Sequence, residues 1–252
     1  MDELIVERSG KVVTVILDRP PVNALTLPLY RRITEVFRDI GASDANCAVL
    51  TARGDAFCAG VDLNELSGLA AEDDPKRSAI VREMYRTVRA CAVPVIAAVN
   101  GAALGGGTML AAVADIRIAS EAASFGMNEI DIGRCGGGGH VGRLIPPGAT
   151  RLLYFTGQPV SAAEALRLGL VDRLVAAAEL LPAAYHLAET IASKSPIGLR
   201  MAKEALNQVE WLPVEEGFEL EQQYSTQLMH TQDAREALRA ALAGRPPRFK
   251  GR

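Results

Sequence analysis

The chain has 252 residues, of which 49% are hydrophobic and 23% are charged, with a formal net charge of −3 at pH 7. This apolar content suffices for a sizeable core, so we expect one main domain with a helical appendage. The slight acidity argues against a nucleic-acid partner and favours a small-molecule ligand. No apolar run approaches the roughly 18 residues of a membrane span, and Met1 to Arg8 lack the order of a signal peptide, so we expect a cytoplasmic protein with no membrane partner.

The first half of the chain alternates strand and helix patterns. The β-branched run Lys11 to Leu17 predicts a buried strand, with Leu4 to Glu7 as its neighbour. From Leu27 to Ile40 the apolar residues recur at spacings of three and four, which predicts an amphipathic helix. The apolar segment Cys47 to Leu50 follows, so these elements form a first β–α–β unit.

Two further units follow in the same order. A periodic segment from Ile80 to Cys91 predicts a helix, and Val95 to Val99 predicts the next strand. A glycine turn at Gly105 then leads into a helix of small residues, followed by the strand pattern Asp115 to Ala119. The alternation predicts the α/β class, with a mainly parallel sheet covered by helices.

After Ser161 the pattern becomes helix after helix, with only the strand-like Val171 to Val175 between them. The last helix carries an apolar stripe that needs cover from the chain or from a partner subunit, and we favour an oligomer. The stripe consists of Ala234, Ala237, Leu238, Ala241 and Leu242. The four cysteines, Cys47, Cys58, Cys91 and Cys135, have no CxxC spacing, so we expect reduced thiols in or near the core and no metal site.

Two glycine turns are the first candidates for chemistry. At Gly60 an apolar strand end meets a helical segment, which leaves the Val61 N–H free to face an oxygen that gains negative charge. A second strand ends at the glycines 105–107, and this turn matches neither the GxGxxG fingerprint nor a P-loop. Each turn alone is also an ordinary tight turn. Together, each after a strand of one sheet, they predict an oxyanion hole with two amide donors.

The third candidate is a carboxylate in an apolar setting. Glu129 lies within Ser124 to Gly133, and desolvation there would raise its pKa, which suits a base that takes a proton beside a carbonyl and returns it. Taken alone, Glu129 could also be a surface or capping acid. Asp131 either belongs to the site or caps a helix, and His140 either reaches the ligand or only begins a helix.

These motifs, in this order, resemble the enoyl-CoA hydratase/isomerase, or crotonase, superfamily over nearly the whole chain. The segments that carry the resemblance are DRPPVNAL, AFCAGVDLNEL, PVIAAVNGAALGGG, ADIRIAS, FGMNEIDIG, TGQPVSAAEALRLGLVD and RPPRFKGR. The resemblance implies a spiral of β–β–α turns over residues 1–195 and a helical trimerisation region over residues 196–252. It further implies a homotrimer or dimer of trimers, an acyl-CoA thioester substrate, and no bound cofactor apart from the coenzyme A of that substrate.

The resemblance also implies the roles of individual residues. The oxyanion amides fall on Val61 and Gly106, and Glu129 falls on the catalytic glutamate. Coenzyme A is expected along the backbone of the two turns, with Lys250 in the basic tail near its phosphates. The residues expected at coenzyme A are Ala59, Gly60, Val61, Asp62, Leu63, Gly105, Gly106 and Lys250.

One departure from the family pattern decides the predicted reaction. Hydratases of this family resemble one another in having two glutamates. The first falls where this chain has Met109, and the second falls on Glu129. Moving a double bond needs one base, so Glu129 alone favours an enoyl-CoA isomerase. The dienoyl-CoA isomerases match less well, because their other acids fall on Met109 and Gly137. A hydratase of fatty-acid metabolism, a decarboxylase, a hydrolase and a non-catalytic acyl-CoA-binding protein stay open as alternatives.

Overall fold

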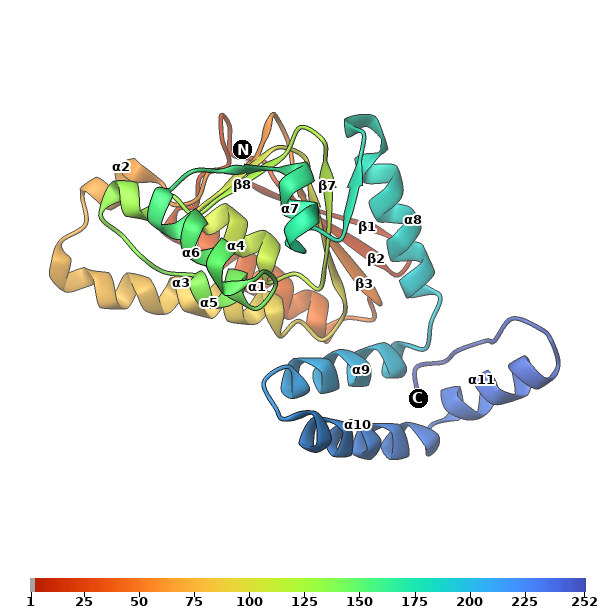
Figure 1. Cartoon of the computed structure of the whole chain (residues 1–252). Coiled ribbons are helices and arrows are strands. Elements are labelled where there is room, and N and C mark those ends of the chain that lie inside the picture. The colour runs from red at the N-terminus through yellow and green to blue at the C-terminus, as the bar shows by residue number, and fades with distance from the viewer. Residues whose placement is uncertain (1–2) are drawn as a thin grey trace.

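The computed structural model describes residues 3–252 and contains two sheets (Figure 1). The larger sheet is made of β1 (Leu4–Ser9), β2 (Val12–Leu17), β3 (Cys47–Ala52), β5 (Val95–Val99), β7 (Ile116–Ser120) and β10 (Arg173–Val175). They lie in the order β1-β2-β3-β5-β7-β10, and every pair is parallel except the antiparallel β1 and β2. The mainly parallel sheet predicted from the alternation is therefore confirmed.

The smaller sheet consists of short strands: β4 (Ala56–Cys58), β6 (Ala102–Leu104), β8 (Ser124–Gly126) and β9 (Val160–Ser161), in the order β4-β6-β8-β9. The strands β4, β6 and β8 follow β3, β5 and β7 along the chain, and they run parallel to one another. Each turn of the chain therefore places one strand in each sheet, as the predicted spiral requires. Because β4 and β6 are neighbours, the segments that follow them lie at the same edge.

The central strands β3 and β5 of the larger sheet are buried on both faces, and their side chains alternate strictly between the two. Ala48 and Leu50 pack into the main core, whereas Cys47 and Val49 face the helix α8 (Leu180–Ala192), which covers the opposite side of the sheet (Figure 1). Helix α1 (Leu27–Ala42) buries its predicted apolar stripe in the main core, and Thr26 caps its first turn. Continuous apolar strands are what a sheet buried on both faces needs.

The other helices differ from the sequence expectations mainly at their ends. They are α2 (Leu63–Ser67), α3 (Asp74–Arg89), α4 (Gly106–Ala112), α5 (Gly138–Gly142), α6 (Pro147–Thr156) and α7 (Ala162–Leu168). The prediction that α3 begins at Ile80 was wrong by more than a turn, because its first residues, DPKR, are polar and carry no apolar period. Pro75 lies in the first turn, where the absence of an N–H costs no helical hydrogen bond.

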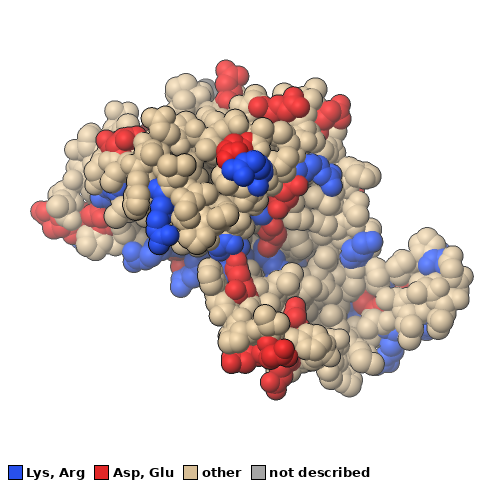
Figure 2. All heavy atoms as spheres, in the orientation of Figure 1, with Lys and Arg blue, Asp and Glu red and all other residues tan. Residues whose placement is uncertain are grey.

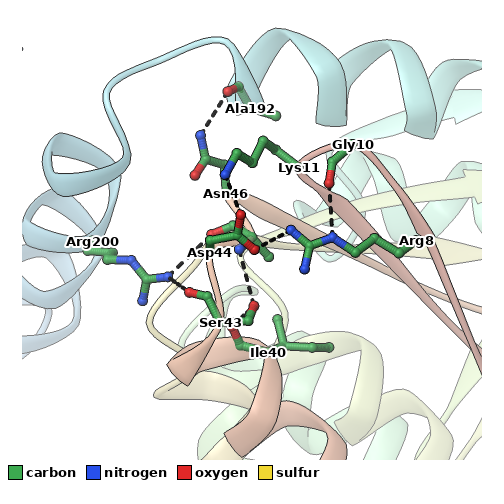
Figure 3. Close-up of polar contacts among 10 residues, drawn as sticks. Arg8, Gly10, Lys11, Ile40, Ser43, Asp44, Asn46, Ala192 and Arg200 are labelled. Atoms are coloured by element: carbon green, nitrogen blue, oxygen red, sulfur yellow. Dashed lines mark hydrogen bonds and ion pairs between the residues drawn. The ribbon is translucent and has the colours of Figure 1, made fainter. Parts of the chain in front are cut away.

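The C-terminal helices α9 (Pro196–Val209), α10 (Val214–Met229) and α11 (Gln232–Leu242) extend below the two sheets (Figure 1). Arg200 of α9 anchors them by donating to Gly41 O at 2.6 Å and to Ser43 O at 2.7 Å. Figure 3 shows the contact with Ser43 and the Asn46 amide that donates to Ala192 O. The division at residue 195 stays a prediction, although the end of α8 and the start of α9 lie at this point.

Of the four thiols, Cys47, Cys58 and Cys91 are buried as predicted, but Cys135 is exposed, which corrects its expected place near the core. It lies in the glycine-rich loop before α5, which leaves it no apolar layer to join. Over residues 3–252, no helix is long and apolar enough to cross a membrane, and no group of acids, histidines or cysteines could hold a metal ion. Figure 2 shows acidic and basic side chains interspersed on the visible face, with acidic residues gathered over α10.

Candidate active site

A cavity of about 960 Å³ lies between α3, the two glycine turns and the segment that follows β8. Nine of the predicted site residues line it: Ala59, Gly60, Val61, Leu63, Gly105, Gly106, Met109, Glu129 and His140. They come from parts of the chain about 80 residues apart in sequence, and the spiral brings them together because each follows a strand of the smaller sheet. A pocket of this size accommodates a small organic ligand.

The two glycine turns are in direct contact. A Cβ atom on Gly60 would lie 2.8 Å from Leu104 O and 3.1 Å from Gly106 N, so only glycine permits this approach. Gly60 also has φ +86°, a left-handed conformation that other residues adopt at a cost. The amides that follow the two turns, those of Val61 and Gly106, therefore point from adjacent places in the cavity wall.

Hydrogen bonds hold the Val61 segment from its other side. Leu25 N donates to Gly60 O at 2.7 Å, and Asp62 N donates to Leu25 O at 3.0 Å, so Val61 lies between two fixed peptide units. Within residues 3–252, neither the Val61 N–H nor the Gly106 N–H has a hydrogen-bond acceptor. Two free amide donors at the wall of a cavity form a site for an oxygen that carries developing negative charge.

Tyr85 of α3 fixes the second of these amides and was not found from the sequence. Its hydroxyl donates to Gly106 O at 2.9 Å, and a Cβ on Gly106 would come within 2.8 Å of the same hydroxyl. Complete burial raises the pKa of Tyr85 well above its usual range, so the hydroxyl stays protonated and donates. In the sequence Tyr85 looks like one more apolar position of an amphipathic helix, and nothing in its spacing distinguishes it.

Glu129 begins a short 3-10 turn, Glu129–Ile132, directly after β8. A Cβ on Gly105, which has φ +51°, would lie 2.9 Å from Glu129 Oε1, so the carboxylate packs against the turn that carries Gly106. Its Oε2 is buried without a hydrogen-bond partner among the described residues. Burial raises the pKa of Glu129, with a smaller opposing effect from its own backbone amide.

A second acid, Glu83, also lines the cavity but has a different environment. It forms ion pairs with Arg86 and Arg38, and these cations hold the pKa of Glu83 below its usual range. Among the cavity-lining residues that the structure describes, Glu129 is therefore the carboxylate without a cationic partner. This arrangement suits a group that gains and loses a proton.

Met109 and His140 line the same cavity. A Cβ on Gly137, which has φ +82°, would lie 2.1 Å from Met109 Sδ, so the thioether packs directly against this glycine. The His140 ring lies 6.3 Å from the ring of Tyr85. Burial, followed by the charge of Arg143, lowers the pKa of His140, so its imidazole is neutral at pH 7.

Three predicted site residues lie outside this cavity. Asp62 caps α2 by accepting from the amides of Asn64 and Glu65 and forms an ion pair with Arg19, so its side chain faces away from the expected coenzyme A path. Asp131 lies at the other side of its 3-10 turn, where a Cβ on Gly157 would come within 2.6 Å of its carboxylate. A helical turn directs residues two apart to different faces, which explains why Asp131 cannot join Glu129.

Lys250 is the third of these residues, and its predicted contact with coenzyme A phosphates stays a prediction, since it does not line the cavity. Its amide donates to Asp233 Oδ1 at 2.7 Å, and the amide of Gly251 donates to the other oxygen at 3.0 Å. The tail is thereby bound to the start of α11, near the end marked C in Figure 1. The sequence analysis missed the arginines that line the cavity, which are Arg77, Arg82, Arg86, Arg89 and Arg134.

Comparisons with known proteins bear on the family and the fold of the chain. The family model described as Enoyl-CoA hydratase/isomerase matches residues 7–252. The chain is 33% identical over 251 residues to a short-chain-enoyl-CoA hydratase of Clostridium acetobutylicum, with 97% of this chain and 96% of that protein covered. It is 38% identical over 221 residues to a (7aS)-7a-methyl-1,5-dioxo-2,3,5,6,7,7a-hexahydro-1H-indene-carboxyl-CoA hydrolase of Mycobacterium tuberculosis, with 86% and 89% covered. The crystal structure of an enoyl-CoA hydratase from Bacillus anthracis superposes with a TM-score of 0.96 at 35% identity and covers all of both chains.

Proposed function

Because the chain belongs to the enoyl-CoA hydratase/isomerase family, we propose that it moves the double bond of an enoyl-CoA thioester, with Glu129 as the base. The observation that carries this proposal is the position of one unpaired carboxylate beside two free amides. Glu129 Oε1 packs against Gly105, the residue before the Gly106 amide. A proton next to a carbonyl bound at those amides would lie within reach of this oxygen.

In the proposed reaction the thioester oxygen accepts hydrogen bonds from Val61 N–H and Gly106 N–H. Glu129 removes a proton from the carbon next to the carbonyl, and the electron pair of that C–H bond passes into the enolate, whose oxygen the two amides stabilise. The same carboxylic acid then returns the proton two carbons further along the chain as the double bond shifts. The product has the atoms of the substrate, and Glu129 is again ionised.

The raised pKa of Glu129 favours this shuttle, because a more basic carboxylate removes a carbon-bound proton more readily. The thioester binds through the backbone of Ala59, Gly60 and Leu63, and the exposed arginines of α3 meet the coenzyme A phosphates. No cofactor takes part other than the coenzyme A of the substrate.

Hydration is the second candidate, since the relative from Clostridium acetobutylicum is named as a hydratase. Addition of water is helped by two acids that hold one water, and here Met109, which lines the same cavity as Glu129, has a thioether that transfers no proton. This residue is our reason for ranking isomerisation first. A non-catalytic acyl-CoA-binding protein would use the same amides but would need no unpaired carboxylate at Glu129.

The decisive experiment compares 3-enoyl-CoA and 2-enoyl-CoA thioesters as substrates of the purified protein, with products identified by mass and NMR. An isomerase converts the first into the second without change of mass. A hydratase adds the mass of one water to the 2-enoyl thioester. If the protein binds both thioesters, shown by a rise of its melting temperature, and converts neither, the binding-protein alternative replaces our proposal.

A further inference from the structure

Arg77, in the first turns of α3, is a buried cation that lines the cavity and has no anionic partner among residues 3–252. Its exposed fraction is 7%, and its Nε is buried without a hydrogen-bond acceptor. Within residues 3–252 no carboxylate forms an ion pair with it. Asp74, one turn earlier, forms its ion pair with Arg134 and interacts with Arg77 only through longer-range electrostatics. A buried charge without a partner carries a large desolvation cost.

The neighbouring side chains offset only part of this cost. The Arg77 guanidinium lies over the ring of Tyr30, 5.9 Å from its centroid. A cation over an aromatic face is stabilised, but by less than the cost of burying an unpaired charge. Tyr30 cannot supply a negative charge, because burial raises the pKa of its hydroxyl to about 12. The cavity therefore contains a preformed site for an anion at Arg77.

The position of Arg77 distinguishes between the two ends of an acyl-CoA. The rings of Tyr30 and Tyr85 meet edge to face at 6.3 Å, and the Tyr85 hydroxyl contacts Gly106 O, so two side chains separate Arg77 from the oxyanion turn. The coenzyme A phosphates are separated from the thioester by the whole pantetheine arm and remain near solvent. The exposed Arg82 and Arg86 on the same helix suit them better than a buried guanidinium.

We infer that Arg77 binds a carboxylate at the far end of the acyl group, so that the preferred substrates are enoyl-CoA thioesters of dicarboxylic acids. This inference rests on the proposed function for the thioester and deepens it by naming the substrate class. A guanidinium presents parallel N–H donors that match the two oxygens of a carboxylate. An acyl chain of equal length that ends in methyl would leave the guanidinium desolvated and without an anionic partner, which disfavours binding of that thioester.

The test uses two pairs of thioesters of equal chain length, one member ending in methyl and the other in carboxylate. The saturated pair measures binding by calorimetry without turnover, and the enoyl pair measures kcat/KM. We expect the parent protein to bind the carboxylated thioester at least about 10-fold more tightly, the factor supplied by one hydrogen-bonded charge pair. Arg77→Met should abolish this preference, and Arg77→Lys should retain part of it.

Lys76→Met is the matched control, because it removes one positive charge from the same turn of α3 but lies outside the cavity, paired with Asp73. It should leave the preference unchanged. Equal binding of the two saturated thioesters by the parent would overturn the inference. It would also be overturned if Arg77→Met lost affinity equally for both thioesters, because this result indicates a packing role beside Tyr30. A preference in binding without turnover of either enoyl thioester would support the inference and refute the proposed function instead.

Discussion

Replacement of Glu129 by Gln removes the proposed base with almost no change of shape. The Val61 and Gly106 amides and the Tyr85 hydrogen bond to Gly106 do not involve this side chain, so binding of a saturated acyl-CoA should be largely retained. Turnover should fall by at least about 10²-fold, equivalent to about 2.7 kcal/mol of transition-state stabilisation, the lower end for loss of a positioned acid–base group. Steady-state kinetics on a 3-enoyl-CoA and calorimetry on the saturated thioester measure the two effects separately.

The same variant has a predicted effect on stability, with a sign fixed by the pKa shift. Burial raises the pKa of Glu129, so at pH 7 the ionised form is less favourable in the folded protein than in the unfolded chain. This penalty is absent below the unfolded pKa and develops as the pH rises through the raised folded pKa. Glu129→Gln should therefore melt at a higher temperature than the parent at pH 7, and the difference should disappear near pH 4.

Two results would refute this reasoning. Unchanged turnover in Glu129→Gln would show that another group moves the proton, and His140 would be the next candidate because it lines the same cavity. A melting temperature that falls at pH 7 would show that the carboxylate is stabilised in the folded state, contrary to its unpartnered Oε2. Glu83→Gln is the matched control, since it changes a carboxylate of the same cavity that is already paired with Arg86.

Three further predictions follow from the site and from the C-terminal helices. Met109→Glu should raise hydration of a 2-enoyl-CoA relative to isomerisation by adding a second carboxylate beside Glu129, and an unchanged ratio in product analysis would exclude this role for position 109. Tyr85→Phe removes the donor to Gly106 O and should lower kcat/KM by about fivefold, equivalent to about 1 kcal/mol, with CoA affinity less affected. Tyr224→Phe, outside the cavity, is its control, and an equal loss in both variants would contradict a positioning role. Leu238 and Leu242 are 63% and 82% exposed, so we expect a trimer by light scattering that Leu242→Asp dissociates, and a parent monomer at all concentrations would refute this assembly.

The sequence predicted the helices and strands whose apolar pattern extends over enough residues to be recognised. The strand Val95–Val99 was predicted from a continuous run of five apolar residues, and the buried stripe of α1 was predicted from apolar residues three and four positions apart. The strands β4, β6 and β8 have three residues each, too few for a period, and only the family resemblance implied the spiral that contains them. The contact of the two glycine turns depends on this second sheet.

Backbone groups of the site were easier to predict than side chains. The places of Val61 and Gly106 follow from the ends of neighbouring strands, which the order of elements determines. The direction of Asp62 depends on Arg19 and on the start of α2, contacts that no local pattern contains. Arg77 was missed for the opposite reason, because a charged residue in a polar helical turn resembles solvated surface until the fold buries it.

In the proposed site, backbone groups bind the thioester oxygen and side chains determine the reaction. The proposed oxyanion donors are peptide N–H groups, so substitutions at position 61 leave the chemical group in place as long as the turn keeps its shape. That shape depends on Gly60, where a Cβ would collide with Leu104 O. The proposed proton transfer, in contrast, depends on the side chains of Glu129 and Met109, which a single substitution can change. If the proposed function holds, binding of the thioester and choice of reaction are therefore separable in this fold, and we expect variants at positions 109 and 129 to change the reaction while they preserve binding.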